Sequence, residues 1–168
     1  MLDILKRMGA DIELIDVRES GGEPVADLRV RAADLHGIEI PTHLVPLAID
    51  EFPVLFVAAA CARGTTVLRG AEELRVKESD RIQVMADGLR TLGVDAEPTP
   101  DGMLIRGGAG IGGGRVHSHG DHRIAMAFAM AALRATAPVE IEDCANVNTS
   151  FPGFVDLAAS AGLGISAC

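Results

Sequence analysis

The sequence predicts an α/β fold of repeated units with the order strand, helix, strand, helix, strand, strand, in which the first unit is incomplete. Two observations predict it. Three amphipathic helices each end at a glycine, and a strand-like run follows each glycine. Two further helices are apolar on every side, which indicates burial, and each precedes a short strand. Internal repetition of this kind is typical of a symmetric domain.

The three glycine-ended helices place the second half of each unit. They are expected at residues 2–9, 84–92 and 154–161, and the strands that follow at 12–15, at 94–97 with 103–106, and at 163–165. In each case the glycine stands where a helix C-terminus needs a left-handed residue.

The two apolar helices place the first half of the middle and last units. They are expected at residues 52–61 and 122–133, with strands at 65–68 and 139–142. The middle unit then covers about 42–107 and the last about 114–168. Met1 enters directly into a helix, so the first unit begins at its second helix. We expect a piece of something larger, or a first strand supplied from elsewhere; the alternative is a short protein with a divergent first unit.

Composition narrows the class of partner. The 168 residues carry a net charge of −9, which argues against nucleic acid or an anionic membrane as the main partner. The longest apolar helix, at 124–133, is too short to span a bilayer. The three cysteines form no CxxC pattern, so we expect reduced thiols in a cytoplasmic protein and no cysteine metal site.

The most informative stretch runs from Arg75 to Arg81 and reads Arg-Val-Lys-Glu-Ser-Asp-Arg. If this turn is helical, Lys77 and Arg81 share a face, and a helix start at Ser79 adds unpaired N–H groups and a positive dipole end. The combination suits a small substrate that carries phosphate and carboxylate groups. Glu78 is a candidate proton carrier. A solvated charged turn is the alternative.

Polar residues recur at the expected helix starts. Asp50 and Glu51 precede the first apolar helix, and the run at 121–123, Asp-His-Arg, opens the second. The segment 148–152, Asn-Thr-Ser-Phe-Pro, opens the last amphipathic helix. In a symmetric domain these ends can converge on one face, where their dipoles and cations would form an anion-binding surface.

Convergence would give two carboxylates a chemical role. Asp50 and Glu78 would lie among Lys77, Arg81 and Arg123, and could serve as base and acid. For Asp50 alone, the alternative is an ordinary carboxylate at a helix N-terminus.

A metal site is a separate alternative. His117, His119, Asp121 and His122 match the HxHxDH pattern of binuclear metal hydrolases, and such side chains could bind zinc. No histidine follows His122 to complete such a site, and Arg123 would place a fixed cation against the metal.

The motifs also resemble a known family. The runs at 74–81, 121–126, 49–53 and 150–152 are similar to the C-terminal half of the 5-enolpyruvylshikimate-3-phosphate synthases, and the resemblance runs nearly end to end, from the helix that ends at residues 8–10 to residue 162. It implies two lobes that close on substrate, each an inside-out α/β domain of three βαβαββ copies. Residues 1–168 would then be one C-terminal lobe, with the N-terminal lobe absent. The resemblance implies no metal and no organic cofactor.

The resemblance also implies the reaction and its acid–base groups. The family joins phosphoenolpyruvate to the 5-hydroxyl of shikimate 3-phosphate and releases phosphate. Asp50 resembles the carboxylate that takes the hydroxyl proton, and Glu78 resembles the donor to the methylene carbon. Lys77 resembles the lysine that contacts the shikimate phosphate and the reacting groups.

The substrate-binding residues follow in the same way. Arg81 and Arg123 resemble the arginines that hold phosphoenolpyruvate, where bidentate guanidinium contacts suit its anionic groups. Asp121 and His122 belong to the same binding motif.

Two positions depart from the family pattern. Some members have asparagine in place of Glu73 and lysine in place of Thr149, so those contacts are open here. Because the N-terminal lobe would supply half of the substrate cage, we expect little activity from this chain alone. A catalytically silent binding or structural module is the second hypothesis.

Overall fold

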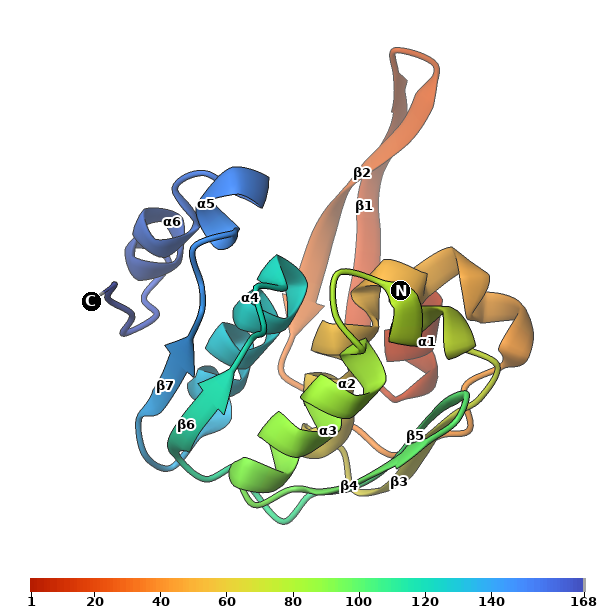
Figure 1. Cartoon of the computed structure of the whole chain (residues 1–168). Coiled ribbons are helices and arrows are strands. Elements are labelled where there is room, and N and C mark those ends of the chain that lie inside the picture. The colour runs from red at the N-terminus through yellow and green to blue at the C-terminus, as the bar shows by residue number, and fades with distance from the viewer. Residues whose placement is uncertain (168) are drawn as a thin grey trace.

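The computed structural model describes residues 1–167 and has the predicted α/β architecture. Figure 1 shows helices α2 (Phe52–Cys61), α3 (Arg81–Thr91) and α4 (His122–Ala131) at the centre, with strands on the outside. The remaining α-helices are α1 (Leu2–Arg7), α5 (Val147–Ser150) and α6 (Phe154–Ser160). The strands are β1 (Asp11–Ser20), β2 (Glu23–Arg31), β3 (Gly64–Leu68), β4 (Asp95–Thr99), β5 (Gly102–Gly107), β6 (Gly114–His117) and β7 (Val139–Glu142). No helix within the described residues is long and apolar enough to cross a membrane.

The central helices form the core because they carry apolar side chains on most of their surface. Phe52 and Phe56 of α2 and Phe128 of α4 are fully buried. Gly88 of α3 faces the Phe128 ring so closely that a Cβ at this position would overlap it. The predicted burial of both apolar helices is confirmed, and glycine is what allows α3 to approach α4.

The middle unit contains the complete βαβαββ order. Its sheet has the order β3-β5-β4, with both pairings antiparallel. Residues 36–40 run parallel to β3 on its other side: Gly37 N donates to Arg63 O at 2.8 Å and Ile40 N to Val67 O at 2.9 Å. The predicted start of this unit near Thr42 is therefore wrong, because residues 42–44 and 46–51 form 3-10 helices instead.

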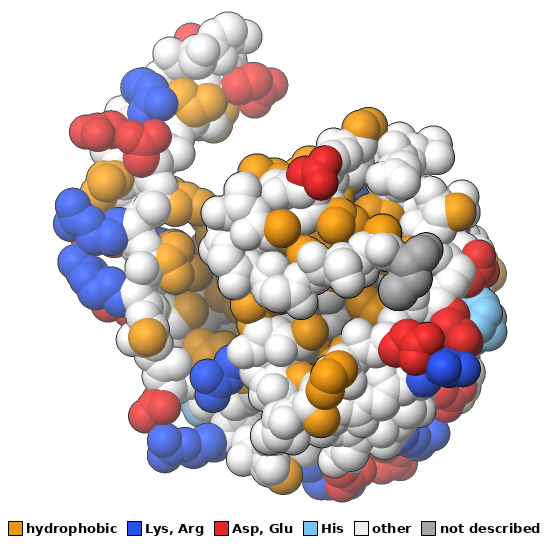
Figure 2. All heavy atoms as spheres, turned by 90° about the vertical axis from the view of Figure 1, so that its left-hand side faces the viewer, with side chains coloured by type: hydrophobic (Ala, Val, Ile, Leu, Met, Phe, Trp, Pro, Cys, Tyr) orange, Lys and Arg blue, Asp and Glu red, His pale blue; other side chains and the backbone are white. Residues whose placement is uncertain are grey.

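The first unit contributes α1 and the β1–β2 hairpin. The hairpin repeats the β4–β5 pair closely: Asp11 lies opposite Arg31 as Asp95 lies opposite Arg106, and the ion pairs measure 3.4 and 3.2 Å. It is much longer than the strand predicted at 12–15, and it projects from the molecule (Figure 1). In Figure 2 it is an arm with charged side chains along one side and apolar ones toward the hollow beside it.

The last unit has a parallel pair, β6 and β7, followed by α5 and α6. The strand predicted at 163–165 is wrong: residues 163–167 form no regular structure. No strand among the described residues pairs with residues 163–167, and an extended segment without a hydrogen-bonded neighbour does not form a stable strand. The glycine prediction itself holds, since Gly9, Gly93 and Gly162 all have φ between 82° and 95°.

Candidate functional site

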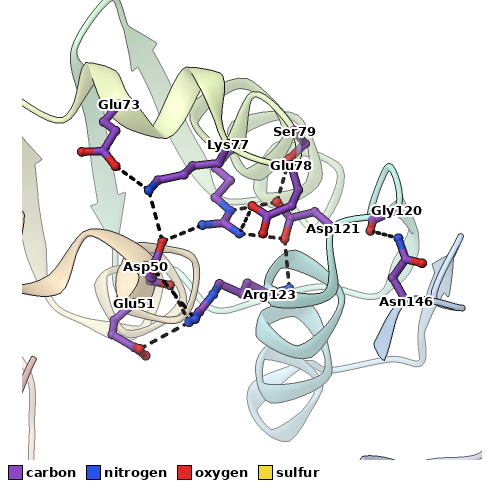
Figure 3. Close-up of polar contacts among 11 residues, drawn as sticks. Asp50, Glu51, Glu73, Lys77, Glu78, Ser79, Gly120, Asp121, Arg123 and Asn146 are labelled. Atoms are coloured by element: carbon purple, nitrogen blue, oxygen red, sulfur yellow. Dashed lines mark hydrogen bonds and ion pairs between the residues drawn. The ribbon is translucent and has the colours of Figure 1, made fainter. Parts of the chain in front are cut away.

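Three of the four helix starts that the sequence predicts to converge meet at one place, whereas residues 148–150 of the fourth lie within α5 and are exposed. Asp50 and Glu51 end the 3-10 helix that leads into α2, Asp80 is the N-cap of α3, and Asp121 is the N-cap of α4. Figure 3 shows side chains from all three regions pointing toward one another. Each N-cap forms because a short carboxylate accepts a hydrogen bond from a free helix N–H group.

A buried ion pair joins α3 to α4. Arg81 is 1% exposed and Asp121 is 0% exposed, and Arg81 Nε donates to Asp121 Oδ2 at 2.8 Å. The hydroxyl of Ser79 donates to the same oxygen at 3.0 Å, and the backbone N–H of Arg123 donates to Oδ1 at 3.0 Å. Burial alone would raise the pKa of Asp121, but these bonds and the Arg81 charge hold it below its ordinary value.

The other side of the Arg81 guanidinium faces two half-exposed carboxylates. Its Nη1 donates to Asp50 Oδ1 at 3.1 Å, and its Nη2 donates to Glu78 Oε2 at 2.6 Å. Arg81 therefore links the two predicted proton-transfer groups, while Asp121 fixes its position from behind.

Asp50 is the carboxylate that all three predicted cations share. In addition to Arg81, Lys77 Nζ lies 3.6 Å from its Oδ1 and Arg123 Nη2 lies 3.9 Å from its Oδ2. Partial burial would raise the pKa of Asp50, but Arg123, Lys77 and Arg81 together lower it. Asp50 is accordingly ionised at neutral pH and can accept a proton.

The cations are already paired with internal carboxylates. Lys77 donates to Glu73, and this bond raises the pKa of Lys77. Arg123 Nη1 lies 3.4 Å from Glu51 Oε1 and donates to the Asp50 carbonyl at 3.2 Å. An incoming anion must therefore displace carboxylates that hold the cations in place.

The segment that carries Lys77 is not helical, which corrects the predicted helix start. Lys77 has an extended backbone (φ −80°, ψ −155°), and α3 begins at Arg81 rather than at Ser79. Lys77 and Arg81 thus meet at Asp50 through a loop and not through a shared helix face.

One residue that holds this loop was missed by the sequence reasoning. Arg75 donates to the carbonyl oxygens of Thr99 and Pro100 at 2.5 and 2.9 Å, and to Asp80 at 2.6 Å. It ties the loop to the β4–β5 turn. Only its place inside the charged run marked it in the sequence.

Two other residues singled out in the sequence, His122 and Thr149, make no side-chain hydrogen bond or ion pair with the described residues. His122 is the first residue of α4 and is partly buried beside the cluster. Thr149 lies in α5 and is exposed.

The zinc-hydrolase alternative is wrong. Asp121, which it needs as a ligand, is enclosed by Arg81 and Ser79. The rings of His117 and His119 lie 4.3 Å apart, and the backbone N–H of His119 donates to His117 Nδ1. Within residues 1–167 no three histidine, cysteine, aspartate or glutamate side chains are grouped as metal ligands. Cys61 and Cys144 are free thiols, and Cys168 lies outside the described residues.

Comparisons with known proteins agree with the motifs. A family model for EPSP synthase (3-phosphoshikimate 1-carboxyvinyltransferase) matches residues 1–157. A 3-phosphoshikimate 1-carboxyvinyltransferase from Alkalilimnicola ehrlichii is 74% identical over 166 residues, which are 99% of this chain and 37% of that protein. One from Methylococcus capsulatus is 70% identical over 165 residues, 98% of this chain and 38% of that protein.

A solved structure of EPSP synthase from Acinetobacter baumannii gives a TM-score of 0.93 at 55% identity, over 96% of this chain and 38% of that one. The chain thus spans little more than a third of the length of these relatives. Since the family model covers nearly all of it, the chain belongs to the EPSP synthase family.

Proposed function

We propose that this chain is the C-terminal lobe of an enolpyruvyl transferase and supplies half of its active site. The reaction joins the enolpyruvyl group of phosphoenolpyruvate to the 5-hydroxyl of shikimate 3-phosphate and releases phosphate. One observation carries the proposal: Lys77, Arg81 and Arg123, from separate segments, surround the carboxylate of Asp50. Family membership supports the choice of reaction.

The cations hold the anionic groups of the substrates. Arg81 and Arg123 would bind the carboxylate and phosphate of phosphoenolpyruvate, for which the planar guanidinium fork is suited. Lys77 carries a compact charge and faces Asp50 Oδ1, the oxygen that Arg81 also contacts. It would contact the shikimate phosphate and the reacting groups. His122 would flank the arginines.

The two half-exposed carboxylates move the protons. Asp50 would take the proton of the attacking 5-hydroxyl, and Glu78 would deliver a proton to the methylene carbon. Because Lys77, Arg81 and Arg123 lower the pKa of Asp50, an anion bound to them offsets their charge and makes Asp50 a stronger base. The filled site would thus be more reactive than the empty one.

Asp121 acts through Arg81 in this proposal and not on the substrate. Its side chain is fully buried and every hydrogen bond it accepts comes from Arg81, Ser79 or the Arg123 backbone. It therefore orients Arg81, and the substrate-binding role given to it by the motif becomes a positioning role.

The remaining length of the longer relatives would supply the opposite wall of the site. We infer that this chain alone turns over little or no substrate, because transition-state stabilisation needs groups from both sides. The proposed reaction needs no metal and no organic cofactor. We also propose that the protein works in the cytoplasm.

The test is turnover of shikimate 3-phosphate and phosphoenolpyruvate by the purified chain, with and without a separately expressed N-terminal lobe. We expect activity only with the partner, and its loss in Glu78→Ala and Arg123→Ala. Asp87→Ala, which removes an exposed carboxylate on the far part of α3, is the matched control and should keep full activity. Full turnover by the chain alone would contradict the split site.

The second hypothesis, a silent binding module, has one observation in its favour. Every cation of the site is already paired with a carboxylate of the chain. Phosphate binding without turnover in the presence of the partner lobe would support this module instead.

A further inference from the structure

The loop at residues 76–79, which carries Lys77 and Glu78, is not anchored by burial. It links a 3-10 helix at 72–76 to α3. Val76 is the only apolar residue of the loop and is 80% exposed, and the side chain of Glu78 is half exposed. Polar contacts must therefore set the position of the loop.

The contacts made inside the site cannot hold the loop once a ligand is present. Lys77 Nζ lies 3.6 Å from Asp50 Oδ1, and Glu78 accepts from Arg81 at 2.6 Å (Figure 3). In the proposed function, an incoming anion takes the place of the carboxylates in these two pairs. The loop would lose both contacts at the moment when Lys77 and Glu78 have to be in place.

Arg75 closes this loop from outside the site. Its Nη1 donates to Asp80 Oδ2 at 2.6 Å, so it joins the residue just before Val76 to the residue just after Ser79. Asp80 also accepts from Gln83 N at 3.0 Å and is thereby fixed to the start of α3. Both ends of the loop are held by one charge-assisted bond, which removes conformational freedom from the residues between them.

The same guanidinium fixes the loop to the β4–β5 turn. Arg75 Nη2 donates to Thr99 O at 2.5 Å and Arg75 Nε donates to Pro100 O at 2.9 Å. A guanidinium, with five N–H donors in a planar fork, can make all three contacts at once. None of the three acceptors is a group that we assign to substrate binding, so these bonds remain when a ligand enters.

The β4–β5 turn is itself held firmly at the end of β3. The Asp101 carboxylate accepts from Gly70 N at 2.8 Å, and the Asp101 carbonyl accepts from Ala71 N at 2.7 Å. A Cβ at Gly102 would lie 2.1 Å from Leu68 O, so the turn and the strand are in close contact. The turn therefore gives Arg75 a support that belongs to the sheet.

We propose that Arg75 is a positioning residue, which holds Lys77 at Asp50 and Glu78 at Arg81 by tying their loop to the β4–β5 turn. It does not touch the substrate. Its effect on the reaction, the part of this inference that rests on the proposed function, comes through the placement of Lys77 and Glu78. A displacement of about 1 Å at a reacting group can cost about a hundredfold in rate.

The placement of Lys77 can be measured in the chain alone, because Lys6 and Lys77 are its only lysines. With 13C at lysine Cε, a pH titration followed by NMR gives one curve for each, and the exposed Lys6 of α1 is the internal reference. The hydrogen bond to Glu73 and the charge of Asp50 raise the pKa of Lys77. We expect Arg75→Ala to lower this pKa, because a displaced Lys77 loses these contacts.

The sign of the shift separates positioning from charge. Removal of the Arg75 charge without any movement would raise the pKa of Lys77, because a neighbouring cation is lost. Arg75→Gln removes the same charge but keeps an N–H group that can donate to the turn. Its Lys77 pKa should therefore lie between those of Arg75→Ala and the wild type.

The matched control is Arg106→Ala. Arg106 is a half-exposed arginine of β5 that pairs with Asp95 at 3.2 Å, on the same sheet but away from the loop. Its loss should leave the Lys77 titration unchanged. Circular dichroism establishes that each variant is folded, and Arg75→Gln decides by the same sign if Arg75→Ala does not fold.

Turnover with a separately expressed N-terminal lobe measures the effect on the reaction. Arg75→Ala should lower kcat/KM about ten- to hundredfold, Arg75→Gln should lower it less, and Arg106→Ala should leave it unchanged. A lowered Lys77 pKa with an unchanged kcat/KM would overturn the role of Arg75 in the reaction.

An unchanged or raised Lys77 pKa in a folded Arg75 variant overturns the positioning itself, whatever the activity. A lowered Lys77 pKa in a chain that shows no turnover with its partner lobe supports the positioning and contradicts the proposed function. The two failures are therefore distinguishable.

Discussion

Replacing Asp121 by alanine should destabilise the chain more than the loss of any other helix cap in the site. Asp121 and Arg81 are 0% and 1% exposed, so the change leaves a buried guanidinium without its main partner. Breaking a buried pair from one side costs about 3–5 kcal/mol, of a total stability of about 5–15 kcal/mol. The lost N-cap of α4 accounts for about 1 kcal/mol of that.

The matched control is Asp80→Ala. Asp80 also caps a helix, by accepting from Gln83 N at 3.0 Å, and it also pairs with an arginine, but that pair is partly exposed. Its loss should cost about 1–2 kcal/mol, the sum of a cap and a solvent-screened ion pair. Urea unfolding followed by circular dichroism measures both free energies. Equal costs for the two variants would refute the argument from burial.

The same pair makes stability sensitive to acid. Burial raises the pKa of folded Asp121, but the hydrogen bond and charge of Arg81, together with the bonds from Ser79 and the Arg123 backbone, hold it below its ordinary value of 3.8. A depressed folded-state pKa stabilises the folded state above pH 3.8, and this contribution is lost as the pH falls below 3.8. Asp121→Asn should therefore lose less stability than the wild type over that range. Some loss remains in the variant, because Asp50 also has a lowered pKa.

Two further predictions concern the site and the core. Glu78→Gln should tighten binding of inorganic phosphate about three- to fivefold, measured by titration calorimetry, because Glu78 occupies the Arg81 nitrogen that the anion needs; weaker binding would contradict this competition. Gly88→Ala should cost about 1–3 kcal/mol, because the new methyl group would overlap the Phe128 ring. Replacing the Phe128 ring by a smaller side chain, in Gly88→Ala/Phe128→Leu, should recover part of the loss. Urea unfolding of the single and double variants should give a coupling energy of about 0.5–3 kcal/mol, and strictly additive costs would show that the two positions do not touch.

Much of the fold could be predicted because local rules determine it. The apolar run at 52–61 cannot sit on a surface, and Gly93 can take the left-handed conformation at low cost, so helix α2 and the end of α3 were placed correctly. Local sequence could not decide whether residues 163–165 form a strand. A strand exists only when a neighbour pairs with it, and pairing depends on residues far away in the sequence.

The site shows the same limit. Charged residues at helix starts predicted that Asp50, Glu78 and Arg81 would meet, because N-caps and their neighbours are local features. The role of Arg75 depends on the carbonyl oxygens of a turn more than twenty positions downstream, at Thr99 and Pro100. No local pattern reports such a contact. Nor could the sequence show that Asp121 would be sealed behind Arg81, since burial is decided by the packing of α3 on α4.

The internal pairing of the cations makes ligand binding an exchange reaction. An anion that enters must replace Asp50 and Glu78 at Arg81, and each of these bonds is lost when the ligand arrives. A small ion with a single charge, such as chloride, replaces only one of them and gains little. A ligand with two anionic groups at the right separation replaces both at once and keeps the charges of the site matched. In the proposed site this exchange would select anions by their valence and by the spacing of their charged groups, and it would keep abundant monovalent salts from binding.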